Sequence, residues 1–279
     1  MYIDLHELLM EATRKQIDLM ESGELKEEML DKAPPVLWFG NINSNSEKIL
    51  TIAANPSRSE FLDKDKYYLP LGKERFRALR ESEHLSDILT SANLRNEIIN
   101  SFNSYFENNP YVRWFGKSVE PYNVEGFLRG LNASYYDLSM ENSIKYSALH
   151  MDLLPFVTKS DFSEILREIR NKNLIQWSRG FLKKLIQVAD PKLIIVFGKT
   201  NFKIFSEIFH FSIDEIHSSN WKKNNGNTIN TSFSTERLFW STPVVGLSTN
   251  LGNPIGFEKG DLQNFGKHIY SELKKRDFV

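Results

Sequence analysis

The sequence contains no cysteine, and this absence removes several classes of chemistry at once. Disulfide bonds, thiol nucleophiles, iron–sulfur clusters and zinc sites built on thiolates are all excluded. The six histidines show no H-E-x-x-H or comparable ligand spacing, so we expect no dedicated metal site. The sequence also lacks a G-x-G-x-x-G dinucleotide fingerprint and a G-x-S-x-G nucleophile elbow.

Long hydrophobic runs and an excess of basic charge are missing as well. No apolar stretch approaches the about 18 residues needed to span a bilayer. The N-terminus is charged and amphipathic, unlike a secretory signal, so we expect a cytoplasmic protein that does not engage membranes. The 35 basic and 36 acidic residues give a net charge of −1. Any contact with DNA must therefore come from a local patch.

Short β-type runs alternate with segments of helical periodicity. The runs are Ile49–Ala54, Ser147–Leu154, Leu193–Gly198 and Pro243–Ser248. The helical segments are Leu85–Phe106, Asp161–Ala189, Thr200–Phe209 and Gly260–Lys275. Strands separated by helices predict an α/β protein with a largely parallel sheet.

The rest of the chain suggests one domain over residues 1–279, with residues 1–35 as a helical extension packed on it. Within that extension we predict a helix over Asp4–Ser22, outside the sheet. Val36–Gly40 and Arg237–Ser241 are candidate edge strands. Ser218–Ser234 is polar and rich in turn residues, which predicts an exposed or mobile loop.

In open parallel sheets the working residues lie just beyond the carboxyl ends of the strands. After the first run comes Asn55-Pro56-Ser57, where proline holds Asn55 at a defined turn. Ser57 or Ser59 could cap a helical turn or donate to a phosphate. The alternative is an ordinary turn, because Asn-Pro is a common turn dipeptide.

The second run ends in His150-Met151-Asp152, and strand alternation puts His150 and Asp152 on one face. A carboxylate among apolar residues needs a partner, because burying it alone is costly. The structural alternatives are an ion pair or a helix cap.

Two further loops follow the later runs. Gly198-Lys199-Thr200 imitates the end of a phosphate-binding loop, but Leu193 occupies the position of its first glycine, so an ATPase is excluded. Lys199 is then a surface charge or a DNA contact. The loop Leu247–Pro254 is small and polar around Leu251, which we expect to be exposed, and an ordinary loop is the alternative.

In this order, the segments resemble the uracil-DNA glycosylase superfamily. Ala53–Ser57 is similar to its first motif, G-x-N-P-G, and Asn55 falls on the position that orients the attacking water. Asp152 falls where the family has a base-reading asparagine, and Leu247–Leu251 looks like the last loop. The resemblance covers roughly residues 49–257 and implies a three-layer α/β/α sandwich around a central, mainly parallel four-stranded sheet.

Two departures bear on the substrate. Leu247 stands where many relatives have a histidine, and His150 is a conceivable substitute. Asp152 replaces asparagine, and a carboxylate accepts from an amino group such as N4 of cytosine, or when protonated donates to N3. This favours cytosine over uracil. Cutting normal cytosine would be toxic, so we expect a modified cytosine, as in the superfamily's bacterial glycosylases that attack phage DNA.

The resemblance implies hydrolysis of the N-glycosidic bond of a flipped base, by a monomer that needs no cofactor. Asn55 and Asp152 are the expected catalytic residues, and Leu251 is the expected wedge into the duplex. The expected base contacts are His150, Asp152, Phe156, Tyr67 and Tyr68, the last three as candidate stacking rings. The expected DNA contacts are Ser57, Arg58, Ser59, Lys199, Ser248, Thr249, Asn250 and Leu251. The alternatives are a repair enzyme acting on uracil and a non-catalytic DNA-binding module.

Overall fold

The computed structural model describes residues 3–23, 26–136, 143–159, 172–210, 218–222, 226, 228–238, 242–252, 257–258, 260–275 and 277. The chain divides into two compact units. Unit 1 comprises residues 1–42, 54–110 and 151–188, and unit 2 comprises residues 43–53, 111–150 and 189–279. The expectation of a single domain therefore stays a prediction, and each unit is described by itself.

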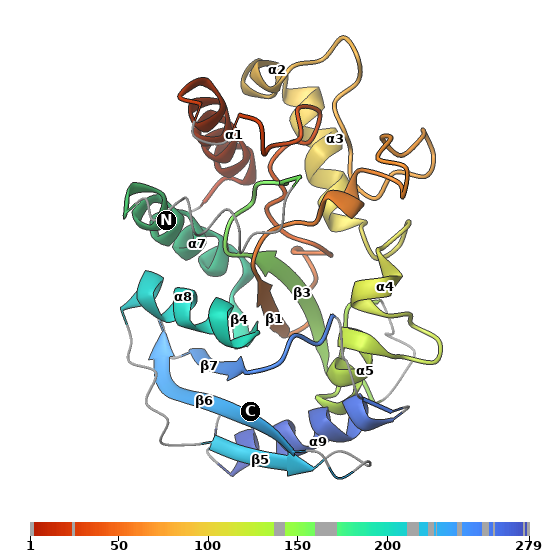
Figure 1. Ribbon diagram of the computed structural model, residues 1–279, viewed down its shortest axis with the longest axis vertical. Helices are drawn as coiled ribbons and strands as arrows, with labels where there is room; N and C mark the ends of the chain where they lie inside the picture. The colour runs from red at the N-terminus through yellow and green to blue at the C-terminus, as the bar shows by residue number, and fades with distance from the viewer. Residues whose placement is uncertain are drawn as a thin grey trace. The chain divides into compact units, whose positions relative to one another are not determined.

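Unit 2 holds the sheet, apart from the last two residues of β3. The strands are β1 (Lys48–Ala53), β2 (Ala133–Ser134), β3 (Tyr146–Asp152), β4 (Pro191–Phe197), β5 (Ser218–Lys222), β6 (Thr228–Leu238) and β7 (Thr242–Leu247). Their order is β2-β3-β1-β4-β7-β6-β5, as the arrows of Figure 1 show for the longer strands. The first five in this order are parallel. The α/β prediction is confirmed, although the predicted sheet had only four strands.

Helices cover both faces of this sheet within unit 2, which gives the expected α/β/α layering. Val196 pairs with Gly246 and Phe197 pairs with Leu247, so neighbours along each strand point to opposite faces. A Cβ on Gly246 would overlap the ring of Phe202 in α8 (Lys199–Phe209). On the opposite face, Phe197 lies against Phe127 in α5 (Asn123–Gly130), which packs on α9 (Asp261–Lys274). α4 (Val112–Phe115) also belongs to this unit.

The polar tract Ser218–Ser234 is not a loop: it contains β5 and most of β6, which form an antiparallel hairpin. The register places Trp221 opposite Ile229, and β6 continues onto β7. Threonine, tryptophan and isoleucine favour strands, and pairing with β7 supplies backbone partners that composition does not reveal. β6 includes the start of the predicted strand Arg237–Ser241, whose last three residues lie outside the described part of the chain.

Unit 1 packs helices around an aromatic core. Its helices are α1 (Leu5–Glu21), α2 (Leu85–Thr90), α3 (Ala92–Asn103) and α7 (Lys172–Ala189), with a short 3-10 turn at Arg58–Glu60. α1 contacts α2 and α3, and the three lie together in Figure 1. Phe76 stacks on Tyr105 and meets Phe102 and Phe39 edge-on. The predicted helix Asp4–Ser22 is confirmed, whereas residues 161–171 of the predicted helix Asp161–Ala189 lie outside the described residues.

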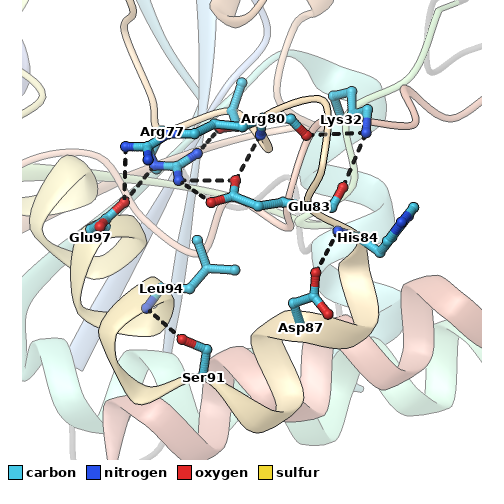
Figure 2. A network of polar contacts seen from close by, with 10 residues as sticks. Lys32, Arg77, Arg80, Glu83, His84, Asp87, Ser91, Leu94 and Glu97 are labelled. Atoms are coloured by element: carbon cyan, nitrogen blue, oxygen red, sulfur yellow. Dashed lines mark hydrogen bonds and ion pairs between the residues drawn. The ribbon is translucent and has the colours of Figure 1, made fainter.

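Two expectations in unit 1 are corrected. Val36–Gly40 is buried but is not a strand. At its two ends, Val36 N–H donates to Pro155 O (2.8 Å) and Gly40 N–H donates to Phe102 O (2.9 Å). The predicted helix Leu85–Phe106 breaks at Ser91, which is extended and ends α2. The hydroxyl of Ser91 also accepts from Leu94 N–H (3.2 Å), which caps α3, as Figure 2 shows. Among the described residues no helix is long and apolar enough to span a membrane.

Candidate functional site

The turn after β1 is held by the side chain of Asn55. Its Nδ2 donates to Thr158 Oγ1 (2.9 Å), to Phe156 O (3.2 Å) and to Pro56 O (3.3 Å). Two of these acceptors lie more than 100 residues further along the chain. Asn55 therefore joins the segment after β1 to the segment after β3, and its amide nitrogen is committed to that role. This half-buried side chain keeps its oxygen as the group that can accept from a bound molecule.

The two segments run side by side for several residues within unit 1. Leu154 N–H donates to Ala54 O (3.2 Å), and Ser57 and Thr158 form an isolated parallel bridge. Arg58 Nη1 donates to Lys159 O (3.0 Å). The structure thus brings the Asn55 turn and the end of β3 together, as the rule for parallel sheets predicts.

Two carboxyl groups are buried in this part of unit 1. Asp152 is 5% exposed at the end of β3, and Glu60 is 3% exposed in the 3-10 turn that follows Asn55. The hydroxyl of Tyr105 donates to Glu60 Oε2 at 2.6 Å. Burial raises the pKa of Glu60 to about 8; the Tyr105 hydrogen bond and the Arg75 charge lower it, and the Asp152 charge raises it. Buried carboxyls of this kind are candidates for acid–base chemistry.

Glu60 is the residue that sequence reasoning missed. It lies in the segment singled out after β1, but a glutamate in a polar turn is typical of a solvated surface. A usable signal was its position: Ser57 caps the turn through a hydrogen bond from Ser59 N–H (3.2 Å), and the buried Phe61 follows at once. One turn of 3-10 helix that ends in buried residues directs one of its side chains inward.

The three candidate stacking rings differ sharply in exposure. Phe156 is only 1% exposed and stacks on Trp177 with ring centroids 5.5 Å apart. The hydroxyl of Tyr68 donates to Asp31 (2.8 Å) and accepts from Lys32 N–H (3.0 Å), which holds that ring half-buried. Tyr67 is 73% exposed. Of the three, Tyr67 is the most exposed and Phe156 belongs to the core, so which ring stacks on a base stays a prediction.

The predicted DNA contacts of unit 1 are at the surface. Ser57 and Arg58 are exposed and Ser59 is half-buried. Ser59 O accepts a hydrogen bond from Arg75 Nη1 at 2.9 Å, which holds the turn against the Arg75 guanidinium. Ser57 uses its hydroxyl oxygen as the cap and keeps its hydroxyl hydrogen for another acceptor.

In unit 2, His150 is a buried member of a polar and aromatic cluster. It is 2% exposed, and its Nδ1 lies 2.9 Å from Thr51 Oγ1, which is also 2.5 Å from the hydroxyl of Tyr135. Its ring lies 4.9 Å from Trp114 and 5.3 Å from Phe115, measured between centroids. These contacts describe a hydrogen-bonded core histidine, so its expected base contact stays a prediction that needs this cluster to open.

The remaining residues predicted to contact DNA, all in unit 2, gather at the carboxyl ends of β4 and β7. Lys199 is exposed at the first position of α8, and Gly198 N–H donates to Leu247 O (2.9 Å) and Thr249 O (3.2 Å). Ser248 and Asn250 are exposed and Thr249 is half-buried. The segments after β4 and β7 meet because these two strands are parallel neighbours in the sheet.

Leu251, the expected wedge, is completely buried. The loop turns inward after Asn250, whose Oδ1 accepts from Gly252 N–H (3.0 Å). Gly252 packs so tightly that a Cβ there would overlap the indole of Trp114. The expectation of an exposed leucine is therefore wrong, because a small polar loop can still bury its one large apolar side chain.

No cluster of three or more potential metal ligands occurs among the described residues. Comparison with protein-family models and with curated proteins finds no match for this chain.

Proposed function

We propose that this chain is a DNA glycosylase that hydrolyses the N-glycosidic bond of a flipped base. The proposed substrate is a modified cytosine, such as glucosylated hydroxymethylcytosine in phage DNA, and the proposed role is antiviral defence inside the cell. The observation that carries the proposal is the buried carboxyl of Asp152 at the end of β3, beside the turn that Asn55 holds. The resemblance of these segments to the glycosylase motifs supports it.

The proposed reaction breaks the bond between C1′ of the sugar and the base nitrogen and forms a bond between C1′ and the oxygen of water. The base leaves with the bonding electron pair and ends protonated, while the water loses its proton. Nδ2 of Asn55 is occupied by three acceptors, so its Oδ1 is the atom that would accept from the attacking water. Asp152 would accept from the amino group of the base.

Insertion into the duplex needs an exposed side chain, and Leu251 does not provide one. Tyr67 and Leu71, which are 73% and 88% exposed, lie on one loop of unit 1. The loop has internal support: Asp63 accepts from Asp65 N–H (2.9 Å) and Tyr67 N–H (3.0 Å). We assign stacking to Tyr67 and the wedge to Leu71, because an ordered loop displays them with little ordering cost on binding.

The test is incubation of the protein with single- and double-stranded oligonucleotides that carry cytosine, uracil, hydroxymethylcytosine or its glucosylated form. Abasic product would be detected as alkali-sensitive strand breaks. We expect product from a modified cytosine and none from cytosine. Product from uracil alone would show that the substrate is uracil, as for a repair enzyme. Absence of product from every oligonucleotide would overturn the proposal that the protein is an enzyme.

Two variants assign the roles. Asp152→Asn is expected to lower cleavage of the modified cytosine and raise the relative rate on uracil, because an amide can donate to O4 and accept from N3–H. Asn55→Ala is expected to abolish cleavage. Its control is Thr158→Val, which removes one acceptor of the Asn55 amide but leaves Oδ1 in place. Equal loss in both variants would assign Asn55 a structural role only.

A non-catalytic DNA-binding module is the second candidate. It is favoured by the commitment of the Asn55 amide nitrogen to protein acceptors and by the burial of Leu251. Binding of the same oligonucleotides without abasic product, unchanged in Asp152→Asn, would establish it.

A further inference from the structure

Thr51 lies at the centre of a buried hydrogen-bond cluster in unit 2. It is completely buried in β1, and among the described residues its hydroxyl oxygen has three polar partners. Leu149 O lies 3.0 Å away, His150 Nδ1 lies 2.9 Å away, and the hydroxyl oxygen of Tyr135 lies 2.5 Å away. All of these residues belong to the same unit. A hydroxyl group carries one hydrogen and two lone pairs, so three partners use its full capacity.

The three contacts of Thr51 are all satisfied by one arrangement of hydrogens. A backbone carbonyl only accepts, so the hydroxyl hydrogen of Thr51 points to Leu149 O. The two lone pairs of Thr51 Oγ1 then accept from the hydroxyl of Tyr135 and from Nδ1 of His150. If Thr51 donated elsewhere, two buried acceptor oxygens would face each other at 3.0 Å with no hydrogen between them, which is costly.

We infer that Thr51 is a positioning residue that accepts a hydrogen bond from Nδ1 of His150 and thereby fixes which ring nitrogen exchanges protons. Nδ1 carries a hydrogen in this arrangement whether the ring is neutral or positively charged. A proton that the ring gains or loses is then carried by Nε2. The rings of Trp114 and Phe115 pack against the imidazole, with centroids 4.9 and 5.3 Å away, and hold its plane.

The consequence for catalysis rests on the proposed function. In that function His150 is an expected base contact, and the departing base ends protonated. Nε2 is the ring nitrogen that we assign to this contact, because Nδ1 is directed to Thr51. Tyr135 acts at one remove from the imidazole, since its hydroxyl donates to Thr51.

The first experiment needs no substrate and detects the hydrogens of the His150 ring directly. Protein with isotope-labelled histidine is studied by NMR that correlates each ring nitrogen with its attached hydrogen, over a pH range that extends above the titration of the ring. We expect a hydrogen on Nδ1 of His150 throughout this range. A neutral ring with its hydrogen on Nε2 would overturn the inference, because Thr51 would then donate to Nδ1.

Three variants separate positioning from packing. Thr51→Val keeps the shape of the side chain but removes the hydroxyl, so the ratio of the Nδ1–H form to the Nε2–H form should fall about fivefold or more. Thr51→Ser keeps the hydroxyl and should keep the ratio. Tyr135→Phe is the matched control, because it removes the other donor to Thr51 and leaves the acceptor of Nδ1 in place. An unchanged ratio in Thr51→Val, or an equal fall in Tyr135→Phe, would contradict the positioning role.

The spectrum of the parent protein and that of Thr51→Ser decide the inference even if Thr51→Val does not fold. A hydrogen on Nδ1 in both supports the positioning role. A neutral ring that carries its hydrogen on Nε2 in either protein contradicts it.

The second experiment measures abasic-site formation in the same variants. Cleavage is expected to fall in Thr51→Val in proportion to the population of the Nδ1–H form and to be retained in Thr51→Ser. Unchanged cleavage in Thr51→Val despite a lower population would overturn the assignment of Nε2 to the base. If NMR finds the hydrogen on Nδ1 but no oligonucleotide is cut, the glycosylase proposal fails and the positioning role stands. If an oligonucleotide is cut while the hydrogen lies on Nε2, the positioning role fails and the glycosylase proposal stands.

Discussion

At the scale of the residue, Asn55 illustrates how one side chain can satisfy two interpretations. Its sequence context is compatible with an ordinary Asn-Pro turn, and its Nδ2 indeed holds a turn by donating to Phe156 O and Thr158 Oγ1. The same anchoring fixes the direction of Oδ1. A group that positions water must itself be held, so the structural contacts do not compete with the proposed role.

Gly252 offers a residue-scale prediction about the loop that buries Leu251. Because a Cβ would overlap the Trp114 indole, Gly252→Ala should lower the free energy of unfolding by about 1–3 kcal/mol. Gly180→Ala is the control, since Gly180 lies in α7 with open space around its Cα, and should raise that free energy by about 0.5–1 kcal/mol. Denaturation in urea measures both. A neutral Gly252→Ala would show that the loop moves freely off Trp114.

At the scale of the element, the segment before α2 is held by one arginine. Arg77 Nη2 donates to both oxygens of Glu83 (2.7 and 2.9 Å), and its Nε donates to Glu97 in α3 (2.7 Å), as Figure 2 shows. Lys32 Nζ adds a bond to Glu83 O (3.0 Å). These contacts attach an irregular segment to a helix and to the chain that follows α1.

Arg77→Lys is expected to lower the free energy of unfolding by about 1–3 kcal/mol, because an ammonium group cannot bind both glutamates in this fork geometry. Burial would raise the pKa of Glu83, but hydrogen bonds from Arg77 and from Arg80 N–H lower it on balance. This contribution is present above the ordinary value of 4.5 and is lost as pH falls below it, so the variant's deficit should shrink in acid.

Urea denaturation at pH 7 and at low pH tests this prediction. The control is Arg80→Lys, whose side chain is 66% exposed and which should change stability by less than about 0.5 kcal/mol. If Arg77→Lys lowered the free energy of unfolding equally at both pH values, the contribution of Arg77 to stability would not depend on the ionisation of Glu83.

At the scale of the whole molecule, the net charge of −1 limits how strongly phosphates can contribute to the proposed DNA binding. Few neutralised phosphates mean a shallow dependence of affinity on salt, so exposed aromatic and apolar contacts carry a larger share. Tyr67→Ala or Leu71→Ala should therefore weaken binding about 5- to 150-fold, as loss of one stacked base or wedge costs about 1–3 kcal/mol.

Fluorescence anisotropy with a labelled oligonucleotide at two salt concentrations measures this effect. Val119→Ala serves as the control, because Val119 is 76% exposed but belongs to unit 2. The proposed assignment would be wrong if Val119→Ala weakened binding while Tyr67→Ala and Leu71→Ala did not.

The sequence by itself determined the α/β class, the central strands and most helices, since these depend on local periodicity and on caps such as Asp4 and Ser57. Tertiary structure decided the rest. Pairing with β7 turned a polar tract into β5 and β6, and packing on Trp114 accompanies the inward turn that buries Leu251. Burial and the charge of Asp152 raise the pKa of Glu60, whereas Tyr105 and Arg75 lower it, and all of these are remote or cooperative effects. Burial and charge pairing depend on residues distant in the chain, which a local pattern cannot encode.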